Sequence, residues 1–336
     1  MLFRQIFRHT HLLCISLLLA ACGQPALDPI PELSVQAGSV GAADIDISRS
    51  EAVFSGVRGT TSAAQKVVLK NTGDVPLVVT SALVGAHRNA FTLSASRSPL
   101  TLAPGSAETL SVRFTPGRAQ VGVLRAALRL SSNDPDERRL TVRLYGLSAR
   151  GEQGSNEPPL QAIVRTLGYT VNVGGRGLIL GTRPAPIGAE VRVSRFQKAS
   201  SGPVTLTPVA RYSPDDPLPY GTYTGASRPV HKTVGTIASG FEQSLNPATE
   251  DGSRVDFEPS SSPFGFFVGS TRYAAHKTYT QDALNSGPVA HAVRVYPLRN
   301  RRGQRLANSY LLAFEPASNG DYQDYVFVVT NVKPAR

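Results

Sequence analysis

Acidic and amide side chains gather between two apolar runs near the end of the chain, at Glu315, Asn319, Asp321 and Asp324. Their oxygens are the ligands that Ca²⁺ prefers in proteins, although the EF-hand spacing and its flanking helices are absent. One expectation is therefore a structural Ca²⁺ that fixes this turn. The alternative is that Asp321 hydrogen-bonds its own backbone while Asp324 pairs with a strand arginine such as Arg294.

Three tyrosines suggest a second candidate site. Tyr212, Tyr220 and Tyr223 lie in or beside residues 213–236, which are rich in Pro, Gly and Tyr and predict a long ordered loop. Aromatic faces in a loop can stack on sugar rings, so these tyrosines are candidate ligand-binding residues. Packing in the core is the other explanation of the same residues.

Signatures of catalysis are absent from the sequence. The histidines show no HExxH spacing and there is no G-x-S-x-G nucleophile elbow. His291 is expected to be an ordinary strand or surface histidine. We therefore predict no catalytic residues. An alternative is a carbohydrate-active hydrolase using carboxylates such as Asp256, Glu258 or Asp282, but nothing in the sequence places a partner across a cleft from them.

Alternating apolar residues predict the strands that position the acidic turn. Tyr310, Leu312 and Phe314 alternate before it, and Tyr325 and Phe327 alternate after it, which is typical of a strand, a turn and a strand. The segments at 164–173, 178–180, 191–196 and 204–209 are read as further strands of the same domain. No convincing amphipathic helix period appears after the amino-terminal segment.

Short alternating segments also recur earlier in the chain, which predicts an immunoglobulin-like β-sandwich followed by a second, larger, jelly-roll-like one. Along residues 124–130, leucines alternate with Arg125 and Arg129, so one face is expected to be buried and the other wet. The fold class is all-β. The expected domains are 45–150 and 160–336, joined by a linker at 151–159; the early strands are read at 67–69, 77–79, 110–114, 124–130 and 140–144.

The first of these domains resembles a known family. Its motifs are Asn71-Thr72-Gly73, Leu102-Ala103-Pro104-Gly105, Val112-Arg113-Phe114-Thr115-Pro116, Ser131-Ser132-Asn133-Asp134 and Val142-Arg143-Leu144-Tyr145-Gly146. Together they resemble the ASH or hydin-like immunoglobulin domain, known in bacterial surface proteins as the "choice-of-anchor D" type. Gly73 and Gly105 suit turns that need a positive φ. The resemblance implies a domain that binds other proteins or spaces a second domain from its anchor.

The closing sequence Gly320-Asp321-Tyr322-Gln323-Asp324-Tyr325-Val326-Phe327 carries a second resemblance. It is similar to the carboxy-terminal β-sandwich module of many secreted bacterial proteins, whose endings read like DYNDNVYLVSN. That resemblance implies a surface module with inferred carbohydrate binding. Asn319 stands where such endings tend to be acidic.

The amino terminus predicts export. Arg4 and Arg8 precede an apolar run that is too short to span a membrane and that ends in Leu19-Ala20-Ala21-Cys22. This ending looks like a bacterial lipobox, so the resemblance implies a signal peptide at 1–21, a lipid on Cys22 and attachment to the cell envelope. Residues 22–44 read as a flexible tether. Cys14 would be removed with the signal peptide, so no disulfide is expected.

The charge favours anionic partners. The formal charge is +11, and removal of the two signal-peptide arginines leaves +9. A basic surface attracts cell-wall polymers, acidic glycans or lipid headgroups, whereas no nucleic-acid recognition motif appears. We therefore expect a lipid-anchored, non-catalytic module that binds an envelope glycan or a surface protein, with no cofactor beyond a possible structural Ca²⁺. The remaining alternative is a purely structural envelope spacer.

Overall fold

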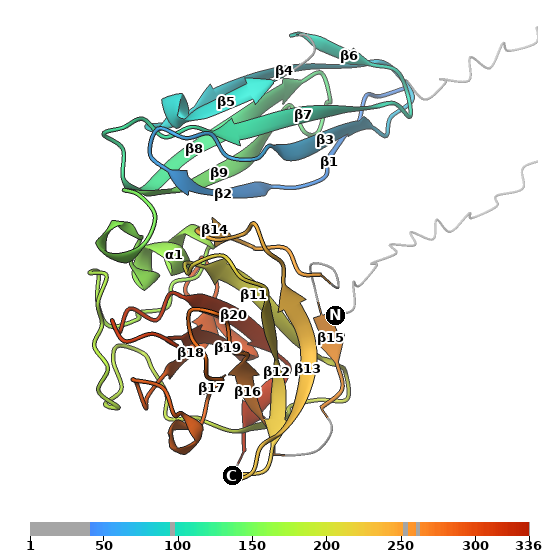
Figure 1. The fold of residues 1–336 in the computed structure, drawn as a ribbon. Coiled ribbons are helices and arrows are strands. Elements are labelled where there is room, and N and C mark those ends of the chain that lie inside the picture. The colour runs from blue at the N-terminus through green and yellow to red at the C-terminus, as the bar shows by residue number, and fades with distance from the viewer. Residues whose placement is uncertain (1–40, 95–97, 251–254, 260–262, 336) are drawn as a thin grey trace, which may run out of the picture. The chain divides into compact units, whose positions relative to one another are not determined.

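The computed structural model describes residues 41–94, 98–250, 255–259 and 263–335 (Figure 1). The predicted signal peptide, Cys22 and most of the tether lie outside these residues. Within the described part of the chain, no helix is both long enough and apolar enough to cross a membrane. The structure is nearly all β, as predicted.

Residues 45–149 form two sheets that face each other as a sandwich. One sheet has the order β1-β3-β7-β5 and the other β2-β9-β8-β4-β6. All pairings are antiparallel except that of β2 with β9, which is parallel. The strands are β1 (Ile45–Ile47), β2 (Glu51–Val57), β3 (Gln65–Asn71), β4 (Leu77–Val84), β5 (Phe91–Ser94), β6 (Leu100–Leu102), β7 (Ala107–Phe114), β8 (Gly122–Ser132) and β9 (Arg139–Ala149).

Burial within this sandwich follows the predicted alternation. Leu128 and Leu130 on β8 are buried while Arg125 and Arg129 are exposed, because successive side chains of a strand point to opposite faces. The five predicted segments all lie in strands. The short strands β1, β5 and β6 carry too few alternating residues to be recognised, and they lie at the edges of the sheets.

The two glycines predicted to be turn residues are needed for different physical reasons. Gly105 has a φ of +75°, as expected, and a side chain there would meet nothing within 4 Å. Gly73 does not adopt a positive φ, so that expectation is wrong. A Cβ at Gly73 would lie 2.1 Å from the carbonyl oxygen of Ala42, so glycine is needed because another backbone segment passes close by. Asp134 accepts hydrogen bonds from several backbone N–H groups, including that of Ile45 at 2.9 Å.

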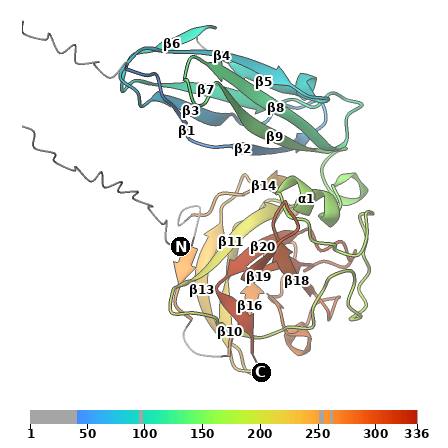
Figure 2. The ribbon, with the colours of Figure 1, turned by 180° about the vertical axis from the view of Figure 1, so that it is seen from behind.

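Residues from 160 onward form the second β-sandwich (Figure 2). One sheet has the order β14-β11-β20-β19-β18, with β15 also paired to β11, and the facing sheet has the order β13-β12-β16-β17. β10 pairs with β21 beside them. The elements are α1 (Leu160–Thr166), β10 (Phe196–Lys198), β11 (Val204–Arg211), β12 (Leu218–Thr224), β13 (Val230–Ile237), β14 (Ser244–Leu245), β15 (Val255–Phe257), β16 (Gly265–Val268), β17 (Thr278–Tyr279), a 3₁₀ turn η3 (Asp282–Leu284), β18 (Val293–Arg299), β19 (Arg305–Phe314), β20 (Tyr325–Thr330) and β21 (Val332–Pro334).

The strands that flank the acidic turn are buried on both faces. Leu312 and Phe327 pack in the core between the two sheets, whereas Leu311 and Val328 pack in a second cluster on the outer face. Helix α1 and residues near Val171 cover that outer face. This explains the nearly continuous apolar runs of β19 and β20, which read differently from strands with one wet face.

Three expectations about this domain are wrong. Residues 160–166 form a helix rather than the start of a strand, and no strand forms in the rest of the predicted segment 164–173 or at 178–180. The strand expected at 191–196 is also wrong, because residues 191–195 are irregular and β10 begins only at Phe196. Residues 213–236 are not one long loop but contain most of the β12–β13 hairpin. Pro, Gly and Tyr misled the prediction because the glycines of this hairpin allow close packing: a Cβ on Gly221 would lie 2.1 Å from the carbonyl of Lys232.

Candidate binding site

The acidic turn is a buried corner between β19 and β20. Glu315 follows β19 and is fully buried, and its Oε2 accepts backbone N–H groups from Asp321 at 2.7 Å and Tyr322 at 3.1 Å. Asn319 donates its side-chain amide to Asp321 Oδ2 at 2.7 Å. The side chain of Asp321 also accepts the N–H of Gln323 at 3.4 Å. The predicted hydrogen bonding of Asp321 to its own turn is therefore present.

Glu157, Gln323 and Asp324 complete the corner. Glu157 comes from the segment before α1 and is buried beside Gln323, whose side-chain amide donates to Glu157 Oε2 at 2.8 Å. A second amide, from Gln243, donates to Glu157 Oε1. Asp324 is buried at the start of β20. The sequence did not implicate Glu157, because it lies in a stretch whose composition reads as a linker.

The four carboxyl groups shift one another's pKa values. Burial and then the charge of Glu315 together raise the pKa of Asp321 to about 7. Burial, followed by the charges of Glu315 and Asp321, raises the pKa of Asp324 well above its usual value. Burial also raises the pKa values of Glu315 and Glu157. The corner therefore concentrates acid groups that resist ionisation.

The salt bridge suggested between Asp324 and Arg294 is wrong. Arg294 is fully buried and pairs with Glu190, which lies in the irregular segment before β10. Among the described residues, no Lys or Arg side chain forms an ion pair with Glu157, Glu315, Asp321 or Asp324. The predicted partner is thus occupied elsewhere.

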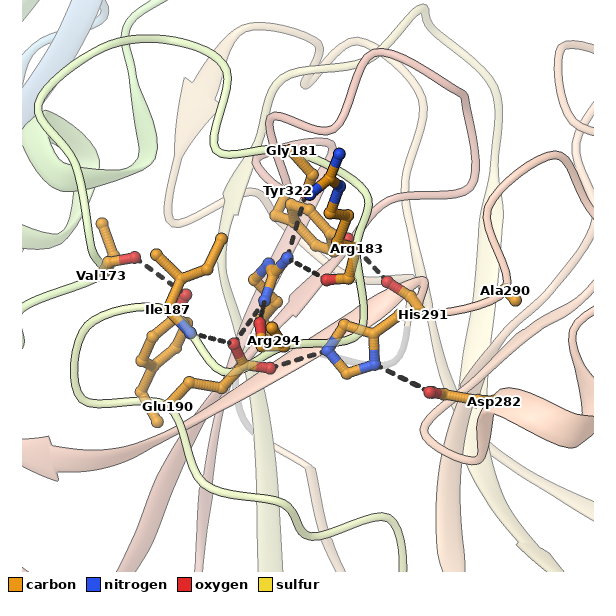
Figure 3. A network of polar contacts seen from close by, with 12 residues as sticks. Val173, Gly181, Arg183, Ile187, Glu190, Asp282, Ala290, His291, Arg294 and Tyr322 are labelled. Atoms are coloured by element: carbon orange, nitrogen blue, oxygen red, sulfur yellow. Dashed lines mark hydrogen bonds and ion pairs between the residues drawn. The ribbon is translucent and has the colours of Figure 1, made fainter.

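Arg294 is the centre of a second polar network (Figure 3). Its guanidinium donates to Glu190. It also donates to the carbonyl oxygens of Gly181 and Arg183, at 3.0 Å in both cases. Its charge lies over the ring of Tyr322, 4.5 Å from the centroid. Because the donors of Arg294 reach three points of the 181–190 segment, they hold that irregular segment against the β18–β19 side of the sheet.

His291 lies between two carboxylates in the same network. Its Nε2 is 2.8 Å from Glu190 Oε1 and its Nδ1 is 2.9 Å from Asp282 Oδ2. Figure 3 shows the imidazole between these two side chains. Ile187 donates its backbone N–H to the other oxygen of Glu190 at 2.9 Å. His291 is therefore not the isolated strand or surface histidine that was expected.

These contacts set the charges of the network. Burial opposes the charged form of His291, but the hydrogen bonds to Asp282 and Glu190 and their charges outweigh it and raise its pKa to about 9. Burial would raise the pKa of Glu190, yet its hydrogen bonds and the charge of Arg294 lower it overall. At neutral pH the imidazolium and Glu190 are both charged.

A cleft of about 730 Å³ opens beside His291. Residues 183–194 form one wall, and this segment is fixed to the sheet by the N–H of Val191 bonded to the carbonyl of Val295 at 2.9 Å. Thr280 lies in the opposite wall. Its hydroxyl donates a 2.7 Å hydrogen bond to the carbonyl of Ser194 and so connects the two walls. The apolar lining includes Val191, Val193, Val293 and Val295, and the polar lining includes Arg183, Arg192, Gln281, Asp282 and His291.

The other predicted site residues lie away from this cleft or are buried. Tyr212, Tyr220 and Tyr223 are between 0% and 1% exposed, so the expectation that their faces are available to a sugar is wrong. They sit on or beside β11 and β12, and each packs in a different buried cluster: Tyr220 between the two sheets, Tyr212 on the outer face beside α1, and Tyr223 with Phe267 and Tyr279.

The carboxylates suggested for a hydrolase have separate partners. Glu258 pairs with Lys198 at 2.6 Å and Asp256 accepts a hydrogen bond from Thr205 at 2.5 Å, whereas Asp282 contacts His291.

One signal in the sequence could have revealed the cleft. In Val293-Arg294-Val295-Tyr296 an arginine interrupts an apolar strand, and a charge in a buried strand requires a buried partner. The partner could not have been named, because Glu190 lies 104 residues earlier in a segment without regular structure.

Comparisons with known proteins concern mainly the first sandwich. Residues 42–149 match the family model described as Cep192 domain 4, which supports an ASH-like immunoglobulin fold for this part of the chain. No curated protein matches the chain.

Solved structures with similarity to the chain include the ASH/PapD-like domain 7 of human CEP192, with 17% identity, covering 37% of this chain and 100% of that domain at a TM-score of 0.26. A second is a Porphyromonas gingivalis protein of unknown function, with 16% identity, covering 32% of this chain and 46% of that one at a TM-score of 0.25. A third is the chaperone YadV, with 14% identity, covering 67% of this chain and 92% of that one at a TM-score of 0.27. Likeness at this level carries no information about ligand or partner.

Proposed function

We propose that this chain is an exported protein, anchored to the cell envelope through a lipid on Cys22, whose second sandwich binds an acidic carbohydrate without turning it over. The cleft beside His291 supports the ligand part of this proposal. The lipobox-like sequence supports the anchor. The ASH-like domain, which precedes the second sandwich in the chain, would serve as a spacer or a second binding domain.

The composition of the cleft is the observation that carries the proposal. Ligand sites combine apolar walls with a few fixed polar groups, and here a floor of valines adjoins Asp282, His291 and Gln281. Arg183 and Arg192 are exposed at this cleft. Val191 bonds one wall to β18, and Thr280 bonds the other wall to β16 and to Ser194, so the backbone of both walls is held in place before a ligand arrives.

A carboxylated sugar fits this combination of groups. Its ring carbons would lie on the valine floor, and its hydroxyl groups would donate to Asp282. Its carboxylate would meet Arg183 or Arg192, because a guanidinium matches a carboxylate in shape and charge. The positive charge of the whole chain adds a long-range attraction to an anionic polymer.

The same network argues against turnover. Glycoside hydrolysis needs a carboxylic acid with a raised pKa that protonates the leaving group. Glu190 has a lowered pKa and is bonded to Arg294 and His291. Asp282, the second carboxylate of the cleft, bonds the opposite nitrogen of the same imidazole. Both carboxyl groups are thus engaged by the same imidazole, which suits binding better than proton transfer.

Calorimetric titration of the mature chain with oligogalacturonate, and with neutral cello-oligosaccharide as comparison, tests the proposal. We expect binding of the acidic oligosaccharide alone, at least tenfold weakened in the double variant with Arg183→Ala and Arg192→Ala. Arg302→Ala removes an exposed arginine at the β18–β19 turn and should leave the affinity unchanged.

Two outcomes would contradict the proposal. Release of reducing ends during the titration would indicate a hydrolase instead. Absence of binding to any envelope glycan or surface protein would leave the spacer as the better account.

A further inference from the structure

The acidic corner gains no support as a metal site. Among the described residues, no group of three or more His, Cys, Asp or Glu side chains is placed to hold a metal ion. Burial raises the pKa values of Glu315, Asp321 and Asp324, so bound protons reduce the charge of this corner. A different part of the molecule carries an unbalanced charge of the opposite sign.

Arginines line a second cleft, of about 760 Å³, in the compact unit that residues 41–336 form. We call this cavity the arginine cleft. Its described lining contains no Asp or Glu, whereas two carboxylates line the cleft beside His291. The four arginines of the lining are Arg125, Arg165, Arg176 and Arg301.

Two arginine-bearing segments without acidic residues meet at the arginine cleft. Residues 158–189 and 283–314 contain no Asp or Glu, and they supply three of the four arginines. Thr170 joins the two segments, because its N–H donates to the carbonyl oxygen of Arg299 at 3.2 Å and its hydroxyl donates to that of Asn300 at 2.9 Å. Positive charge from distant parts of the sequence is therefore gathered in one place.

Arg301 is held at the arginine cleft by groups on several sides. It forms a 2.8 Å ion pair with Glu51, and its guanidinium carbon lies 3.6 Å from the centroid of the Tyr145 ring. A Cβ on Gly168 would lie 2.7 Å from a guanidinium nitrogen of Arg301, so the turn after α1 passes close to this side chain. The Nε of Arg301 is nevertheless buried without a hydrogen-bond partner among the described residues. This fixed arginine therefore has a donor that lacks an acceptor.

The other three arginines of the lining have no counter-charge. Arg125, Arg165 and Arg176 are exposed, and none of them forms an ion pair within the part of the chain that the structure describes. Like charges around one cleft repel each other, and a cleft of a single sign concentrates ions of the opposite sign. An anion bound there would relieve the repulsion and would accept charge-assisted hydrogen bonds from the guanidinium groups.

We propose that the arginine cleft binds a ligand with two or more adjacent phosphate groups. At neutral pH a phosphate group carries a charge of about −1.5 to −2 and three acceptor oxygens, so it can bind more than one guanidinium. A carboxylate has a single charge and two oxygens, which one guanidinium satisfies. Because Glu51 balances Arg301, the charges of the other three arginines remain, which corresponds to about two phosphate groups. The proposal does not depend on carbohydrate binding in the cleft beside His291.

Calorimetric titration of the mature chain with sodium diphosphate tests the proposal. We expect one diphosphate per chain, with at least tenfold weaker binding of monophosphate and of citrate, which offers carboxylates in place of phosphates. Uridine diphosphate distinguishes two sources of the same chemistry. Binding tighter than that of diphosphate would indicate a nucleotide ligand, and equal binding would indicate free or polymeric phosphate.

Variants test whether the arginines of the cleft are responsible. The double variant with Arg165→Ala and Arg176→Ala should weaken diphosphate binding at least tenfold, because it removes two unpaired charges. Both side chains are exposed, so the variant is expected to fold, which its circular dichroism spectrum checks. Arg138→Ala removes an exposed arginine just before β9 and should bind diphosphate like the parent. Equal affinity for citrate and diphosphate, unchanged binding in the double variant, or no binding by the folded parent would overturn the proposal.

Discussion

Arg294 and His291 hold the irregular segment that forms one wall of the cleft. Arg294 connects β18 to Glu190 and to the backbone of residues 181–185, while His291 joins Glu190 to Asp282 on the opposite wall. Removing one member of a buried charged pair leaves the other uncompensated, which costs far more than loss of a surface pair. Substituting Arg294 or His291 should therefore change the free energy of unfolding more than substituting an exposed charged residue.

Arg294→Met should lower the free energy of unfolding by about 3–5 kcal/mol, because Glu190 would remain buried without its partner. Urea denaturation followed by circular dichroism measures this change. Arg272→Met is a suitable control, since the Arg272 side chain is 66% exposed and 4.0 Å from Asp216, and its loss should cost at most about 1 kcal/mol. Equal effects of the two changes would contradict the structural role given to Arg294.

The pH dependence of stability should reveal His291. Its pKa of about 9 exceeds the ordinary value of 6.5, so its contribution is fully present below pH 6.5 and is lost as the pH rises through 9. Glu190, whose pKa is lowered, stays charged in this window, and Tyr322 stays neutral because its pKa is raised to about 12.

The carboxyl groups of the acidic corner also lose stabilising energy as the pH rises, because their pKa values are raised. Comparing the parent with His291→Gln separates the contribution of His291 from theirs. Urea denaturation at pH values from 6 to 9.5 should show a steeper fall for the parent than for the variant. Parallel curves would mean that the imidazole is not held in its charged form.

At the scale of elements, alternation predicted the strands and burial confirmed most of them. The central strands β8, β9, β19 and β20 were evident from the sequence because their apolar residues repeat over many positions. The tyrosines of β12 were misread because Pro and Gly around them are typical of loops. Helix α1 was missed since seven residues are too few to show a helical period.

The turn at Gly73 gives an element-scale prediction. Gly73→Ala would place a Cβ 2.1 Å from the carbonyl oxygen of Ala42, so the two backbone segments must move apart, at a cost of about 1–3 kcal/mol. Thermal denaturation of the variant measures the cost. Gly177→Ala is the control, because a Cβ there meets nothing within 4 Å and the backbone is not left-handed. A Gly73→Ala variant as stable as this control would refute the close approach.

At the scale of the whole molecule, the sequence predicted an all-β chain but not the cleft. The acidic corner was visible because its residues are close together in the chain. The cleft joins residues from 183 to 295 across irregular backbone, so no spacing in the sequence indicates that they meet. Glu157 was not predicted as part of the acidic corner because it lies 166 residues before Gln323, its partner there.

The proposed anchor makes a prediction about the whole chain in the cell. Cys22→Ala removes the only residue that can carry the lipid at the lipobox, so the protein should no longer be retained in the membrane fraction. Globomycin should block processing of the parent at the same step. Cys14→Ala, within the predicted signal peptide, is the control and should leave retention intact. Unchanged retention of Cys22→Ala would refute the lipid anchor.

The most direct test of the proposed ligand site is a crystal structure of the mature chain with bound oligogalacturonate. The account predicts sugar density in the cleft beside His291, with a uronate carboxylate within hydrogen-bond distance of Arg183 or Arg192 and the ring on the valines of the floor. Sugar density confined to another surface, with the cleft empty at saturating ligand, would contradict it.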